Sequence, residues 1–114
     1  KKMAITNATI GSTTSAIYTS SGNNAITTII VCNTATFDPN NPLTGQTNLY
    51  LYAVPNGGNP SSPVTNTLIV NALPIPAGET VSFDQEKMVL GSGDELKAIC
   101  SASGLTATVS TLVV

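Results

Sequence analysis

Residues 105–114 read LTATVSTLVV, a stretch in which apolar side chains alternate with small polar ones almost to its end. A period of two residues places every second side chain on the same face of a β-strand. Threonine and valine, which dominate the stretch, are residue types that strands favour. The segment therefore predicts a strand with one face against a core. Because 106–114 is uncharged and strongly strand-forming, we expect it to be paired within a sheet or covered by a neighbouring subunit.

Strand patterns of this kind recur along the rest of the chain. Residues 48–54 (NLYLYAV) alternate leucine and tyrosine, and residues 25–33 (AITTIIVCN) are apolar on both sides at their centre. The second pattern indicates a central strand covered on two faces. A further strand over 64–73 is expected to end at a Pro-rich turn over 74–78. No stretch of 11 residues carries apolar groups at helical spacing, so we expect an all-β fold of about eight strands.

The connections between these segments favour an antiparallel β-sandwich. Residues 36–47 and 55–63 are rich in Pro, Asn and Gly and are long enough to cross between two sheets in a Greek-key manner. A length of 114 residues suits one domain over 1–114. The sandwich is expected to be jelly-roll-like or immunoglobulin-like. Residues 1–11 are suited to form an N-terminal arm that reaches onto a neighbour.

Composition excludes two classes of partner. The chain has four cations, all lysines, and contains neither arginine nor histidine. Neutralising phosphates and reading guanine both need basic groups, so we expect no nucleic-acid partner. No apolar run approaches the roughly 20 residues that span a bilayer, and we expect no membrane partner. Charged residues make up 9% of the chain, against roughly 25% in a typical domain, which suits docking by shape and hydrogen bonds.

The residues offer little for catalysis. Without histidine, neither a Ser-His-Asp nor a Cys-His arrangement can form. Asp84 and Glu86 are two residues apart and would share one face of a strand, so they are a conceivable acid/base pair. They are more simply a solvated strand end beside Lys87. We therefore expect a protein that is not an enzyme and uses no cofactor.

Metal sites are also not expected. Asp38, Asn40 and Asn41 place oxygen side chains in one loop, as calcium prefers. The Asp-x-Asp-x-Asp-Gly spacing is missing, and so are the Cys/His sets that hold zinc. Asp94 follows a Gly-Ser-Gly turn, where its carboxylate is expected to accept hydrogen bonds from nearby backbone N–H groups.

Two cysteines, Cys32 and Cys100, lie in separate apolar runs. They could form one disulfide in an oxidising compartment. The favoured alternative is two reduced and buried small hydrophobic residues, since neither has the charged neighbours that activate a thiol.

Tyr50 and Tyr52 are the candidate partner contacts. Their alternate positions put them on one face of a strand, opposite Leu49 and Leu51. Two adjacent tyrosines form a rigid amphipathic patch for a partner protein or a sugar ring. The equal alternative is that the tyrosines lie in the core and the leucines face elsewhere.

Three short motifs resemble those of a known class of proteins. They are IIVCNT at 29–34, PAGET at 76–80 and LGSGDEL at 90–96. Together they resemble small β-sandwich virion proteins of tailed bacteriophages, and the resemblance covers roughly residues 25–114. It implies a decoration (cement) subunit of the capsid or a small component of the neck, tail or fibres. It also implies assembly in the host cytoplasm, where thiols stay reduced, and it supplies no catalytic residue.

The sequence therefore leads to two functional hypotheses. The first is a structural protein of a bacteriophage virion, a homo-oligomer that docks on other virion proteins such as the major capsid or neck and tail proteins. The alternative is a secreted or surface bacterial adhesion or carbohydrate-binding β-sandwich domain that uses Tyr50 and Tyr52. A disulfide between Cys32 and Cys100 would favour the alternative.

Overall fold

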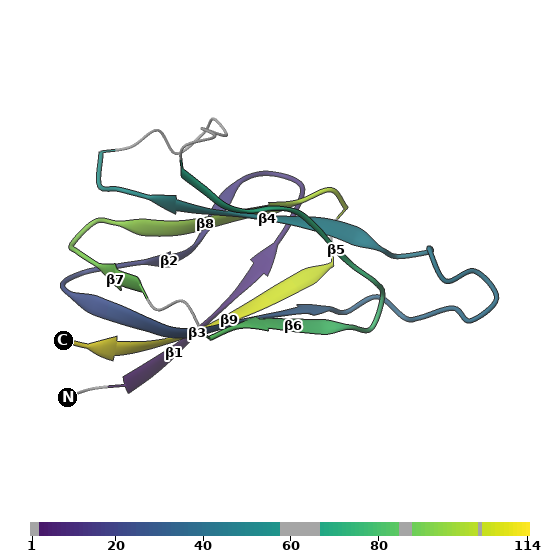
Figure 1. Ribbon diagram of the computed structural model, residues 1–114, viewed down its shortest axis with the longest axis horizontal. Coiled ribbons are helices and arrows are strands. Elements are labelled where there is room, and N and C mark those ends of the chain that lie inside the picture. The colour runs from purple at the N-terminus through teal and green to yellow at the C-terminus, as the bar shows by residue number, and fades with distance from the viewer. Residues whose placement is uncertain (1–2, 58–66, 85–87, 103) are drawn as a thin grey trace.

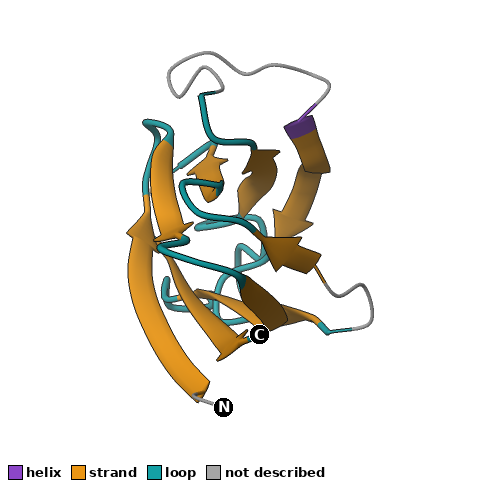
Figure 2. Ribbon diagram, turned by 90° about the vertical axis from the view of Figure 1, so that its left-hand side faces the viewer, coloured by secondary structure: helices purple, strands orange, loops and turns teal. Residues whose placement is uncertain are grey.

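A computed structural model describes residues 3–57, 67–84, 88–102 and 104–114. In Figure 2, strands and connecting loops account for nearly all of this part of the chain. The strands are β1 (Met3–Ile10), β2 (Ser15–Thr19), β3 (Asn24–Asn33), β4 (Thr47–Val54), β5 (Leu68–Ile75), β6 (Thr80–Phe83), β7 (Met88–Leu90), β8 (Glu95–Cys100) and β9 (Leu105–Val113). Among the described residues, no helix has the length and apolar character to cross a membrane.

The strands form two antiparallel sheets that pack face to face (Figure 1). The order in sheet A is β1-β9-β3-β6, with β7 also paired to β3, and the order in sheet B is β2-β8-β4-β5. The all-β sandwich prediction is confirmed. Of the two topologies that the sequence left open, this order is that of the jelly roll, because the successive strands β1, β2 and β3 alternate between the sheets.

The two long connections behave differently. Residues 34–46 join β3 of sheet A to β4 of sheet B, so the predicted crossing between sheets is confirmed there. The prediction is wrong for the second connection, because β4 and β5, which flank it, pair with each other in sheet B. A loop between two neighbouring antiparallel strands needs only to return the chain, however long it is.

Inward side chains of both sheets form one apolar core, which explains the two-residue period of the sequence. Leu105, Ala107 and Val109 of β9 all point into it and are buried. A fully buried leucine or valine side chain contributes roughly 1.5–3 kcal/mol. The core comprises Ile10, Ile17, Ile26, Ile29, Val31, Leu49, Leu51, Ile75, Leu90, Leu96, Ala98, Cys100, Leu105, Ala107 and Val109.

The C-terminal segment lies inside sheet A. Strand β9 pairs with β1 on one side and with β3 on the other, so its backbone groups are paired along both edges. The prediction that this segment is paired within a sheet is confirmed. Residues 3–10 of the proposed N-terminal arm form β1 at the edge of the same sheet, and the start of β1 lies beside the end of β9 (Figure 1).

Strand β3 departs from the sequence prediction on one face. It is central in sheet A, as predicted, with β9 on one side and β6 and β7 on the other. The prediction that both faces are covered is wrong, since Ile30 points away from the core and is 40% exposed. The apolar run at the centre of β3 therefore serves the core with one set of side chains and the surface with the other.

Candidate functional site

The structure places the tyrosines of β4 on the outer face of sheet B. Leu49 and Leu51 are buried in the core, so Tyr50 and Tyr52 point the other way. Tyr52 is only 6% exposed and lies opposite Lys97 in the neighbouring strand, whereas Tyr50 is half-buried. Only Tyr50 therefore keeps appreciable accessible surface, and its contact with a partner remains a prediction.

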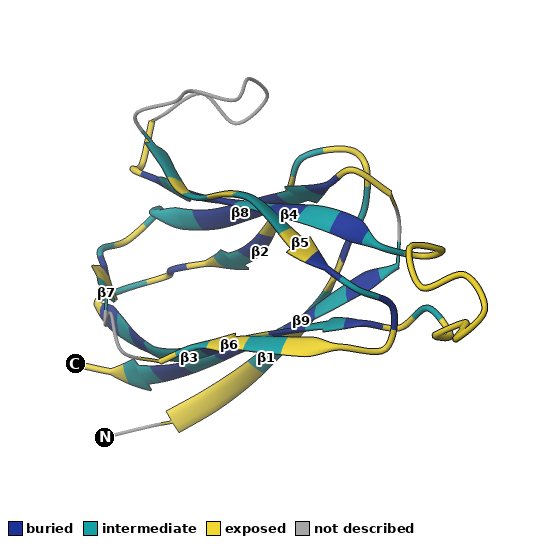
Figure 3. Cartoon of the chain, turned by 45° about the vertical axis from the view of Figure 1, so that its right-hand side comes forward, coloured by how far each residue is buried: buried dark blue, intermediate teal, exposed yellow. Residues whose placement is uncertain are grey.

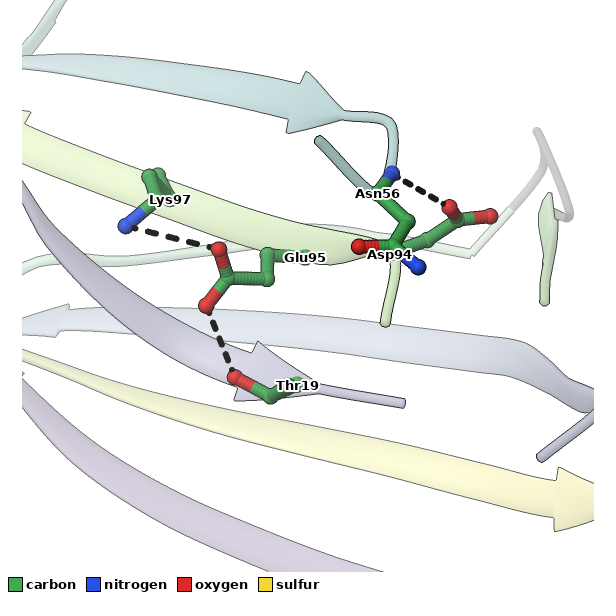
Figure 4. A network of polar contacts seen from close by, with 5 residues as sticks. All are labelled: Thr19, Asn56, Asp94, Glu95 and Lys97. Carbon is green, nitrogen blue, oxygen red and sulfur yellow. Dashed lines mark hydrogen bonds and ion pairs between the residues drawn. The ribbon is translucent and has the colours of Figure 1, made fainter. Parts of the chain in front are cut away.

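The charged residues beside these tyrosines contact each other. The Nζ of Lys97 lies 3.6 Å from Oε1 of Glu95, and the hydroxyl of Thr19 donates a 3.0 Å hydrogen bond to Oε2 of the same carboxylate. Figure 4 shows this chain of contacts, which links β2 to β8. The side chain of Lys97 is 10% exposed and that of Glu95 is 26% exposed, so salt screens this pair less than it would a fully exposed one. The arrangement is a structural tie between strands.

Asp94 has the role predicted for it. Its Oδ2 accepts a 2.9 Å hydrogen bond from the backbone N–H of Gly91, and its Oδ1 accepts a 2.8 Å bond from that of Asn56 (Figure 4). The carboxylate thus closes the turn before β8 and fastens it to the end of β4. Both oxygens are occupied by backbone donors.

Of the other acidic candidates, the structure describes Asp38 and Asp84 but not Glu86. Asp84 follows β6, and its proposed partner Glu86 lies outside the described residues. Within the described part of the chain, no three His, Cys, Asp or Glu side chains come close enough together to hold a metal ion. Asp38 instead accepts a 3.0 Å hydrogen bond from the backbone N–H of Asn40, as a loop-forming aspartate does.

The two cysteines are free thiols. Cys100, at the end of β8, is buried in the core between the sheets, and its Sγ donates a hydrogen bond to the carbonyl oxygen of Ala102 at 2.6 Å. Cys32 lies opposite Thr106 on the outer face of sheet A and is half-buried. Cys100 points into the core from sheet B, whereas Cys32 points away from the core on the far side of sheet A. The reduced interpretation holds for both thiols, and the prediction of burial holds for Cys100 alone.

The outer face of sheet A is the most distinctive surface of the molecule. Residues that lie opposite each other in paired strands share a face, so the strand registers identify its members. None carries a charge. We call this set the A face: Met3, Ile5, Asn7, Thr9, Ala25, Thr28, Ile30, Cys32, Thr80, Ser82, Val89, Thr106, Thr108, Ser110 and Leu112.

Exposed apolar side chains are scattered among the hydroxyl groups of the A face. Met3, Ile5, Ile30 and Val89 are all exposed large apolar residues, and Ile5 is 69% exposed. Figure 3 shows β1 exposed along most of its length. A shallow hollow lies over β1 and β9, lined by Asn7, Ala8, Thr9, Thr106, Ala107 and Thr108.

Charges flank the A face without entering it. Glu79 and Asp84 lie just before and just after β6, and the remaining described carboxylates lie in the 34–46 loop or at the start of β8. Covering the described residues of the A face therefore desolvates no charged side chain among them, and desolvating a charge is the costly part of burying a surface. Alternation of Thr106, Thr108 and Ser110 was visible in the sequence, but the A face became recognisable only with the order of the strands.

Comparison with known proteins gives no match by sequence and a weak structural likeness. No family model matches the sequence, and no curated protein matches it. One solved structure, described as "Bacillus endospore appendages form a novel family of disulfide-linked pili", is 12% identical, with a TM-score of 0.48, over 99% of this chain and 86% of the other. A likeness at this identity and TM-score carries no inference about function.

Proposed function

We propose that this chain is a non-enzymatic structural subunit of a bacteriophage virion, which docks on neighbouring subunits of the capsid or of the neck and tail through its A face. The observation that carries the proposal is the uncharged A face, with exposed apolar side chains set among hydroxyl groups. Charged residues are likewise depleted at the centre of interfaces between proteins.

The physical argument concerns what covering the A face would achieve. Ile5, Ile30 and Val89 hold apolar area in water, and burial recovers about 25 cal/mol for each Å². Threonine and serine hydroxyls can donate and accept hydrogen bonds to a partner backbone. These groups lie on strands that are already ordered, so binding a partner does not have to order a loop, and this favours affinity.

Two features support the virion part of the proposal. The motifs that resemble phage virion proteins form the end of β3, the turn before β6 and the turn before β8. The free thiols of Cys32 and Cys100 suit assembly in the reducing cytoplasm of a host cell. Its partners would then be other virion proteins, and its location would be the virion.

The adhesion alternative has less support. It requires a patch of two exposed tyrosines, and a disulfide between the two cysteines would favour it. Tyr52 is buried, and both cysteines are free thiols.

The proposal is tested by mass spectrometry of purified phage particles whose genome encodes the chain. We expect the protein in particles that have been washed and banded by density, in a fixed ratio to the major capsid or tail protein. Absence from such particles, with the protein recovered in the host cytoplasm or medium, would reject the virion role.

A further inference from the structure

Each of the two sheets has two edges, which makes four in the described part of the chain. The strands at three of these edges are short or irregular. Strand β2 has five residues and a register shift between Ala16 and Tyr18. The edge beside β3 is divided between β6, with four residues, and β7, with three. Short strands and bulges are devices that stop a sheet edge from pairing with another chain.

Strand β5 is interrupted in several ways. Its register with β4 shifts twice between Leu49 and Tyr52. Ala72 has a φ of 54°, which turns its peptide groups out of the regular ladder. Pro74 has no backbone N–H to offer.

Strand β1 has none of these features. All eight of its residues, Met3–Ile10, pair with β9 without a register shift. It contains neither a proline nor a charged residue. No described strand lies on its other side, so alternate residues direct backbone N–H and C=O groups away from the sheet. A long, regular and uncharged edge is a template for strand addition.

We propose that β1 pairs antiparallel with β1 of a second copy of this chain, joining two A sheets into one continuous sheet. The inference deepens the proposed function, because it names one of the neighbours on which the subunit docks. It also extends the A face across the junction.

The sequence of β1 is self-complementary about Thr6. A two-fold axis at Thr6 sets Ala4 opposite Ala8, Ile5 opposite Asn7 and Met3 opposite Thr9. Residues of like parity then meet, so the outward side chains of both copies stay on one face and the free backbone groups face each other. The two alanines allow close approach on the inward side.

The outward side of the junction supplies apolar contact. In this register the two Ile5 side chains are diagonal neighbours, at a Cα separation of about 7–8 Å, which aliphatic side chains can bridge. Ile5 is otherwise among the most exposed apolar residues of the described chain. The strand carries no charge that would oppose its own copy, and none that would select a charged peptide instead.

A charge-swap experiment tests the pairing. Analytical ultracentrifugation over a concentration series is expected to show the wild-type protein at twice its chain mass of 11.6 kDa. Ile5→Lys and Ile5→Glu should each sediment as a single chain, because like charges meet across the axis. An equal mixture of the two variants should recover the dimer. Ser82→Lys, on the A face but on β6, is the matched control and should leave the dimer unchanged.

The outcomes separate this inference from the proposed function. A wild-type protein that stays monomeric, or an Ile5→Lys variant that associates as the wild type does, overturns the β1 pairing. If a monomeric protein is still found in purified particles, the virion proposal stands and only the β1 pairing is rejected. Thermal unfolding of each variant checks that the fold is retained. We expect no loss of fold, because Ile5 and Ser82 are exposed.

Discussion

The side-chain amide of Asn33 donates a 2.8 Å hydrogen bond to the carbonyl oxygen of Gly45, at the far end of the loop that follows β3. The same amide donates to the carbonyl of Ile75 at 2.9 Å, and its Oδ1 accepts from the N–H of Ala35 at 3.0 Å. One buried side chain therefore fixes both ends of the 34–46 loop and the end of β5. This residue belongs to the IIVCNT motif, so part of that motif has a structural role.

Replacing Asn33 by alanine should lower the free energy of unfolding by about 3 kcal/mol, since buried carbonyl groups lose their donors. Urea denaturation measures the effect. Asn40→Ala, on the exposed part of the same loop, is the control and should change the stability by less than about 0.5 kcal/mol. Equal effects of the two variants would contradict the role of Asn33.

The turn before β8 gives a second prediction, which compares two glycines. Gly93 has a φ of +86°, and a Cβ built on it would lie 2.5 Å from Cγ of Asn56. Gly93→Ala should therefore destabilise the protein by about 1–3 kcal/mol. Gly22→Ala, where nothing lies within 4 Å of the added carbon, is the matched control and should have little effect.

A second substitution separates the two causes of strain at Gly93. Asn56→Ala combined with Gly93→Ala removes the clash and leaves only the backbone penalty, so part of the loss should be recovered. If the double variant is only as stable as the sum of the two single effects predicts, or less stable, the clash is not a cause.

The parity of β4 gives a third prediction. Leu51 is 1% exposed and Leu43 is 74% exposed. Leu51→Ala should cost about 2–5 kcal/mol by leaving a cavity, and Leu43→Ala less than about 0.5 kcal/mol. Thermal or urea unfolding checks both. A small effect at Leu51 would mean that the tyrosine side of β4 faces the core after all.

The thiols give a fourth prediction, measured with a chromogenic thiol reagent. In the native protein one thiol, Cys32, should react, and Cys100 should react only after unfolding. Cys32→Ser should remove the native reaction. Two unreactive cysteines that appear only after reduction would reveal a disulfide and restore the adhesion alternative.

Much of the fold follows from local sequence. The alternation over 105–114 predicts β9 because its inward side chains must all reach one core. Strand β5 shows the limit of this reasoning, since it continues through Pro74 to Ile75, where a turn was expected. Proline is tolerated at that place because β5 is an edge strand and needs no donor on its free side.

The surfaces were harder to predict than the strands. Tyr50 and Tyr52 were assigned to one face, but the side of the sheet that they occupy depends on how β4 packs on the other sheet. The A face contains residues that are far apart in the sequence, such as Met3 and Leu112, which lie near opposite ends of the chain. Only the pairing of distant strands brings them together.

The measurement that tests the docking role of the A face most directly compares two exposed isoleucines. Ile30 lies on the A face and is 40% exposed, and Ile69 lies on β5 of sheet B and is 46% exposed. Particles assembled in cells that supply Ile30→Lys should contain at least about tenfold less of the protein than those with Ile69→Lys, since burying an unpaired charge costs more than 1.4 kcal/mol. Equal incorporation of the two variants, or loss of Ile69→Lys alone, would contradict docking through the A face.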